Sequence, residues 1–239
     1  MPLRGRVFTH EELEEVFANC PIREVDFEVR FTPRFRIQQE IWRFQEAIVS
    51  DYPDVSTEQA LLPGGGKLDV TVFRNDVAAR LIKISTQNLA LAFSSYTNFE
   101  EFKQEVISRT HQFATLYALD HFVRVGLRYV NEIALLSQEP ESLTQYVRPL
   151  LAFERFPLNT IQQFAMQISA AFDKHMATIR AALIAGPIRT YVLDIDAHSE
   201  VVTHLNQISD LLDDFHDSAQ KIFLDSVTEE YKQVMRGIQ

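Results

Sequence analysis

The sequence predicts an α+β fold in which an antiparallel sheet is backed by long helices. Residues 25–31, VDFEVRF, alternate strictly between apolar and polar side chains, which is typical of a strand with one buried and one solvated face. Short strand patterns joined by brief turns occur further along the chain, and longer segments repeat apolar residues at helical spacing. These helices would cover the apolar face of the sheet.

In the first half of the chain, a capping-box pattern predicts a short helix over HEELEEVFANC, before the strand at 25–31. Apolar residues at helical spacing then predict a helix over residues 37–48, and we expect Trp42 within it to lie in the core. After the flexible loop PGGGK, three strands are expected, at residues 67–74, 79–86 and 88–95. Thr97 or Asn98 would cap the long helix that follows. Its predicted buried stripe comprises Phe99, Phe102, Val106, Phe113 and Tyr117.

The second half repeats this order. VRVGLRY at residues 123–129 alternates as VDFEVRF does, and a helical stretch from Ser142 is interrupted by Pro149. Three further strands are expected, near residues 161–172, 178–185 and 189–197. A last long helix is predicted to begin at a Ser199 cap. It would carry a heptad seam formed by Val201, Leu205, Ile208, Leu212, Phe215, Ala219 and Ile222.

Each half therefore reads β-α-β-β-β-α, and the two are offset by about 98 residues when Arg30 is matched to Arg128. This predicts a single globular unit over residues 1–239 that contains pseudo-repeats at 22–118 and 121–225. The element order resembles the doubled saddle of the TATA-box-binding protein family, an analogy of fold that implies no function. The alternative is an unrelated α+β sheet whose halves agree by chance.

Composition favours an ordinary globular protein with its own core, because 46% of the 239 residues are hydrophobic and 23% are charged. The single cysteine cannot form an intrachain disulfide, and no Cys/His cluster has zinc-site spacing. The N-terminal residues lack the apolar region of an export signal, and the most apolar stretch, residues 177–188, is too short to span a bilayer. We therefore expect a cytoplasmic protein with no membrane partner.

The net charge of −10 is concentrated in one segment, where ten acidic residues between Asp194 and Glu230 are accompanied by Lys221 alone among the lysines and arginines. Such a surface repels phosphate backbones, so nucleic acid is not the expected partner. A solvated helix face is the usual explanation of such a charge run.

Common catalytic signatures are missing from the sequence. PGGGK is not a phosphate-binding P-loop, because Leu61 and Leu68 stand where that motif requires Gly and Ser or Thr. The sequence also contains no G-x-G-x-x-G, G-x-S-x-G or H-E-x-x-H motif. We therefore expect no cofactor, and the absence of signatures favours a non-enzymatic role without settling the question.

The segment YVLDIDAH is the first candidate site, because strand alternation places Asp194, Asp196 and His198 on one face. Alternate strand positions are nearly 7 Å apart, so three such side chains rarely close on one ion. The structural interpretation is a polar strand face, and no bound metal is then expected. The alternative is a Mg²⁺ or Mn²⁺ site built from Asp194 and Asp196 with an acid from elsewhere.

The segment GLRYVN is the second candidate, a binding site that comprises Arg124, Arg128 and Asn131. Gly126 would share the outer strand face with the two arginines and leave room there for a carboxylate or phosphate. In the structural alternative, Arg128 pairs with Asp194 or Asp196 on a neighbouring strand.

Six segments occur in an order that resembles a known family: NCPIREVDFEVRFTP, DYP, YTNFEEFKQEV, VRVGLRYVN, LDIDAH and FHDSAQKIFLDSVTEEY. The family is a sporadically distributed set of bacterial proteins of similar length and unassigned function. The resemblance implies a bacterial, cytoplasmic protein and supplies no catalytic residue. Its sporadic distribution would suit a partner in a defence or toxin–antitoxin type system.

These observations support three hypotheses of function. The favoured one is a non-enzymatic interaction or assembly protein that self-associates or binds a protein partner. Its interaction helix would use Val201, Leu205, Ile208, Leu212 and Phe215, although the same seam could simply pack on the sheet. The second is a divalent-metal-dependent hydrolase or nuclease that uses Asp194 and Asp196, with His198 nearby. The third is a curved sheet that binds nucleic acid through Arg124 and Arg128.

Overall fold

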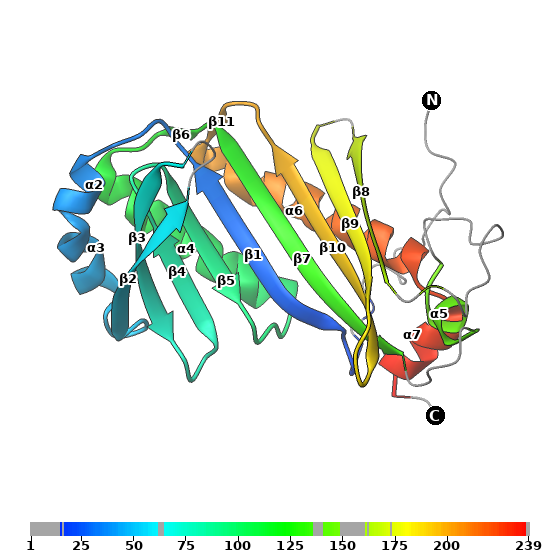
Figure 1. The fold of residues 1–239 in the computed structure, drawn as a ribbon. Helices are drawn as coiled ribbons and strands as arrows, with labels where there is room; N and C mark the ends of the chain where they lie inside the picture. The colour runs from blue at the N-terminus through cyan, green and yellow to red at the C-terminus, as the bar shows by residue number, and fades with distance from the viewer. Residues whose placement is uncertain are drawn as a thin grey trace. The chain divides into compact units, whose positions relative to one another are not determined.

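A computed structural model of the chain confirms the α+β class. It describes residues 15, 17–61, 65–135, 141–148, 161, 163–172 and 174–237. Nine strands form one antiparallel sheet, hydrogen-bonded in the order β2-β3-β4-β5-β1-β7-β10-β9-β8, and helices accompany it (Figure 1). The chain separates into two compact units. The first unit comprises Glu24–Leu127 and His198–Phe215, and the second comprises the rest.

The first unit contains five strands of the large sheet, two short strands that pair separately, and several helices. Its sheet strands, in chain order, are β1 (Ile22–Arg30), β2 (Asp54–Leu61), β3 (Lys67–Asn75), β4 (Arg80–Ile84) and β5 (Asn88–Phe93). Its helices are α2 (Arg36–Gln39), α3 (Ile41–Ile48), α4 (Phe99–Tyr117) and the beginning of α6 (Ile208–Ser226). Two short strands, β6 (His121–Phe122) and β11 (Thr203–His204), pair separately, and a 3-10 turn at Leu205–Gln207 leads into α6.

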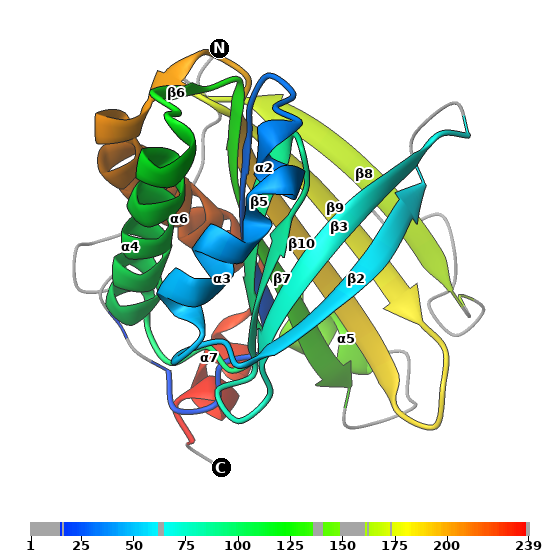
Figure 2. The ribbon, with the colours of Figure 1, turned by 90° about the vertical axis from the view of Figure 1, so that its left-hand side faces the viewer.

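The core of the first unit lies where the apolar strand face meets α3 and α4, which Figure 2 shows on one side of the strands. Alternation along β1 buries Phe27 completely, as the sequence predicts, and Phe27 pairs with Leu91 of β5. Aromatic rings join the layers: Phe44 of α3 lies 6.0 Å from Phe73 of β3 and 5.5 Å from Phe113 of α4. Phe44, Phe73 and Phe113 are all fully buried.

Helix α4 begins and ends at residues suited to those positions. Asn98 is its N-cap, and its side chain accepts a hydrogen bond from the Glu101 amide at 2.9 Å. The helix ends at Ala118, whose φ of 52° is left-handed, a conformation that usually favours glycine. This turn sends the chain back toward β6.

The second unit contains the strands β7 (Arg124–Leu135), β8 (Phe164–Ala171), β9 (Met176–Ile184) and β10 (Arg189–Ser199). The division from the first unit falls within β1, β7, β10 and α6. Strand order here is β7-β10-β9-β8, with β8 and β9 joined as a hairpin in which Ile168 pairs with Ile179. Its helices are α5 (Glu141–Tyr146), the remainder of α6 and α7 (Glu229–Met235).

Several sequence expectations differ from the structure. The first half has four strands between its helices, and the sequence pattern predicted only three of them. The strand that it missed is β2, in which seven of the eight residues are exposed, so no alternation of buried and exposed side chains marks it. The duplicated saddle stays a prediction. The last helix does not begin at Ser199, since β10 extends to that residue and α6 begins at Ile208. Most of the predicted first helix lies outside the described residues.

Within the described ranges, no helix is long and apolar enough to span a membrane.

Candidate functional site

In the second unit, a cluster of polar side chains is built around Asp194 of β10. Arg128 of β7 donates from Nε to Asp194 Oδ1 at 2.8 Å and from Nη2 to Oδ2 at 3.0 Å. Arg180 of β9 donates from Nη1 to Asp194 Oδ2 at 3.2 Å and from Nε to Gln167 of β8 at 3.1 Å. We call Arg128, Gln167, Arg180 and Asp194 the Asp194 cluster. It links all four strands of the unit by side-chain hydrogen bonds.

Burial within this cluster is uneven. Asp194 is only 6% exposed, whereas the side chains of Arg128 and Arg180 are 41% and 42% exposed. Both carboxylate oxygens of Asp194 therefore accept hydrogen bonds from guanidinium groups at a site from which water is largely excluded. The expected pairing of Arg128 with Asp194 is present, and the carboxylate already has two positive partners.

The predicted metal ligands do not form an ion site in the described part of the chain, where no group of three or more His, Cys, Asp or Glu side chains is placed to hold a metal. Asp194 is engaged by arginines, and Asp196 is half-buried one strand period further on. His198 falls beyond the division between the units. If a cation bound at Asp194, it would have to displace at least one guanidinium.

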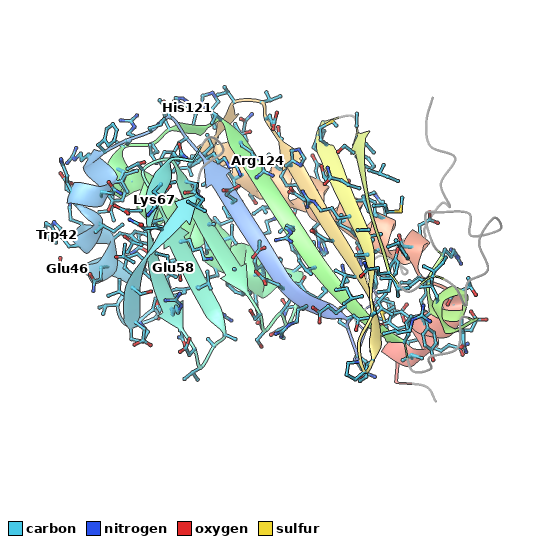
Figure 3. All side chains as sticks on the ribbon, viewed as in Figure 1. Trp42, Glu46, Glu58, Lys67, His121 and Arg124 are labelled. Carbon is cyan, nitrogen blue, oxygen red and sulfur yellow. The ribbon has the colours of Figure 1, made fainter. Side chains whose placement is uncertain are left out.

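The space above Gly126 is filled, contrary to the expectation that it could receive an anion. A β-carbon at Gly126 would lie 2.7 Å from Nη1 of Arg124, so the Arg124 guanidinium covers this glycine. The same Nη1 donates to Glu28 Oε2 at 2.9 Å (Arg124 is labelled in Figure 3). Glu28 also accepts hydrogen bonds from Arg30 and Asn88, at 3.0 and 3.1 Å. Arg124 therefore belongs to an ion-pair cluster of the first unit.

Asn131 does not share a surface with Arg128, because strand alternation turns its side chain to the buried face of β7. It is 2% exposed, and its amide nitrogen donates to the backbone oxygen of Leu193 at 3.1 Å. Asn131 and Arg128 therefore lie on opposite faces of β7, and a binding role for Arg124, Arg128 and Asn131 stays a prediction.

The predicted interaction helix buries three of its five predicted contact residues in the structure. Ile208, Leu212 and Phe215 are at most 1% exposed, because the apolar side of α6 packs into the core. Val201 is 71% exposed but precedes the helix, and Leu205 lies in the 3-10 turn. The seam is a core element and presents no continuous surface to a partner.

Trp42 is 53% exposed, although its position in an amphipathic segment suggested the core. Figure 3 shows Trp42 and Glu46 on the outer side of α3, away from the strands. The signal was present in the sequence: the buried positions of this segment include Ile37, Phe44 and Ile48, and Trp42 is out of phase with them.

The two strands at the ends of the sheet order, β2 and β8, differ in charge. β8 contains no charged residue, and Ala165, Gln167, Ile168, Ser169 and Ala171 are exposed. β2 carries the exposed acids Asp54 and Glu58. Edge strands are often protected by charged side chains, and β8 lacks this protection within Phe164–Ala171. The sequence pattern did not single out β8 as a surface, because strand order cannot be read from it.

No protein-family model matches the chain, and no curated protein matches it significantly. The function is therefore argued from the Asp194 cluster and from the two edge strands, β2 and β8.

Proposed function

We propose that this protein is a non-catalytic assembly protein that pairs with a second copy of itself through the outer edge of β8. The observation that carries the proposal is an uncharged, exposed strand at the end of the sheet order in a protein with a net charge of −10. Two copies with this net charge repel one another, and an uncharged edge adds no further repulsion at the point of contact.

Twofold symmetry strengthens the argument. In an antiparallel pair of identical strands, each residue meets the one equally far from the centre on the other side, and like charges opposite each other are destabilising. Because β8 is uncharged, every register avoids this cost. A β2 pair centred on Ser56 would instead set Asp54 opposite Glu58, two acidic side chains.

The Asp194 cluster supports this function by holding β8 in place. Gln167 of β8 is tied through Arg180 to Asp194, and thereby to strands β9, β10 and β7. An edge strand that is held rigidly loses less conformational entropy when it pairs. In this proposal the carboxylate positions an interaction surface and takes no part in chemistry.

The other hypotheses receive less support. A metal-dependent reaction at Asp194 requires guanidinium groups to be replaced by a cation, so heat on titration with Mg²⁺ or Mn²⁺ would favour that alternative. A nucleic-acid interface would need Arg124 and Arg128, both of which are engaged in ion pairs. A role in a bacterial defence or toxin–antitoxin type system stays a proposal that follows from the sequence resemblance.

Light scattering across a concentration series tests the assembly. A pair of eight-residue strands is a small interface, so we expect a reversible dimer whose fraction grows with concentration. Ala165→Lys on β8 should weaken association at least about tenfold, which is about 1.4 kcal/mol. Ala60→Lys, at an exposed alanine of β2, is the matched control and should leave it unchanged. A wild type that is monomeric at every concentration, or equal effects of both variants, would overturn the proposal.

A further inference from the structure

A cavity of about 440 Å³ lies in the first unit, lined by residues of the chain that joins β1 to α2 and of the chain that joins α4 to β6. Its apolar wall includes Phe31, Phe35, Tyr117 and Leu119. Small-molecule sites commonly have volumes of about 300–1,000 Å³ and mostly apolar walls with a few polar groups. The size and the composition of this cavity both fall in that class.

The walls of the cavity are fixed by contacts outside it. The ring of Phe31 is 3% exposed and lies 5.7 Å from that of Phe113. The Arg34 amide donates to the backbone oxygen of Thr86 at 2.7 Å, which holds the segment after β1 against the turn between β4 and β5. The Tyr117 hydroxyl donates to the backbone oxygen of Glu40 at 3.1 Å. These contacts within the protein hold the walls of the cavity in place.

The basic residues of the cavity wall differ in whether an acidic side chain already pairs with them. Arg36 pairs with Glu40 at 2.7 Å, and Glu40 is shared with Arg43 at 2.8 Å. His121 lies 2.7 Å from the Asp120 carboxylate, at the end of the wall (His121 is labelled in Figure 3). The Arg34 side chain has no hydrogen-bond or ion-pair partner among the residues that the structure describes.

The local charge balance favours an anion. Arg34, Arg36 and Arg43 supply three positive charges, and Glu40 and Asp120 supply two negative ones. Asp120 is 79% exposed, and the hydrogen bond from His121 lowers its pKa, so its charge is hydrogen-bonded and largely solvated. One positive charge remains beside an apolar cavity, in a protein whose net charge is −10.

We propose that this cavity binds a small monocarboxylate, whose carboxylate pairs with Arg34 and whose apolar body lies against Phe35 and Leu119. A guanidinium presents two parallel N–H donors that match a carboxylate. A single unpaired arginine balances one negative charge, which favours a monoanion over a multiply charged phosphate. This site lies in the first unit and is independent of the assembly proposed for β8.

Isothermal titration of the full chain with octanoate tests the proposal, and 1-octanol and inorganic phosphate serve as separate probes. We expect octanoate to bind one molecule per chain, 1-octanol to bind at least about tenfold more weakly because it lacks the charge, and phosphate not to bind. Arg34→Gln should weaken octanoate binding at least tenfold and leave 1-octanol binding unchanged. Arg23→Gln removes an exposed arginine outside the cavity and is the matched control.

A second variant separates the cavity from the charge. Thr32→Phe adds bulk at an exposed wall residue and should reduce binding of octanoate and 1-octanol together, with circular dichroism showing that the fold is retained. The proposal is overturned if octanoate gives no heat at millimolar concentration, if Arg34→Gln and Arg23→Gln behave alike, or if phosphate binds in place of octanoate.

Discussion

Removal of Arg128 tests whether Asp194 is a structural carboxylate. In Arg128→Met, the Asp194 side chain loses two hydrogen bonds and keeps the single one from Arg180, at 3.2 Å. Asp194 is 6% exposed, so its charge cannot regain full hydration. The variant leaves a poorly compensated negative charge inside the sheet.

The expected loss of unfolding free energy follows from how deeply each partner of the Arg128–Asp194 ion pair is buried. Breaking a fully buried ion pair by removing one partner costs about 3–5 kcal/mol. Arg128 is 41% exposed and a second arginine remains, so solvent and Arg180 compensate part of this loss. We expect Arg128→Met to lower the free energy of unfolding by about 2 kcal/mol. Asp194→Asn should cost about 1 kcal/mol, because both arginines can turn to water and the amide oxygen still accepts a hydrogen bond.

Urea denaturation with linear extrapolation measures these values, and the double variant completes a thermodynamic cycle. The coupling between Arg128 and Asp194 should be about 1 kcal/mol. Arg30→Met is the matched control, since the Arg30 side chain is 54% exposed and Glu28 retains Arg124. We expect this control to cost less than about 0.5 kcal/mol. A coupling near zero, or a control as costly as Arg128→Met, would refute the structural role and return Asp194 to the candidate catalytic groups.

Three further predictions concern the backbone, pH and fluorescence. Ala118→Gly should raise the urea midpoint by the equivalent of about 0.5–1 kcal/mol, because glycine adopts the left-handed conformation without strain; a lower midpoint would contradict this. Burial raises the pKa of Tyr191 and Tyr231 from 10.0 to about 12, so their stabilising contribution is present below pH 10 and is lost as the pH rises toward 12. Tyrosinate absorbance should therefore rise together with unfolding, and ionisation of every tyrosine near pH 10 in the folded protein would be the opposite result. Trp42, the only tryptophan, should be readily quenched by acrylamide, whereas a protected emission would place it in the core.

Much of the strand pattern could be predicted from the sequence, because period-two alternation reports directly on burial. The β1 pattern of buried Val25, Phe27 and Val29 is the clearest case. β2 could not be predicted in this way, since neither of its faces is covered. The start of α6 was misread because Val201 and Leu205 fit the heptad spacing by coincidence. Thr203 is in fact paired with Phe122, a contact between distant segments that local periodicity cannot reveal.

The candidate site was predictable only in part. Pairing of Arg128 with an acid of β10 follows from charge complementarity between outward-facing positions, and the structure contains that pair with Asp194. Participation of Arg180 and Gln167 depends on the strand order β7-β10-β9-β8, in which β7 and β10 are neighbours although β8 and β9 lie between them in the chain. Local sequence patterns carry no information about that order.

The arrangement around Asp194 favours a structural role over a catalytic one, for a reason that does not depend on the absence of sequence motifs. A carboxylate that acts as a base, nucleophile or metal ligand needs an oxygen that can exchange its partner during the reaction. Each oxygen of Asp194 is held by a guanidinium, and Oδ2 is held by two. The exposed parts of the cluster are the arginines and Gln167, so the guanidinium groups are accessible to solvent and the carboxylate is not. This pattern of exposure suits a carboxylate that links four strands through hydrogen bonds. A reactive carboxylate requires the opposite pattern, in which the acid itself is accessible.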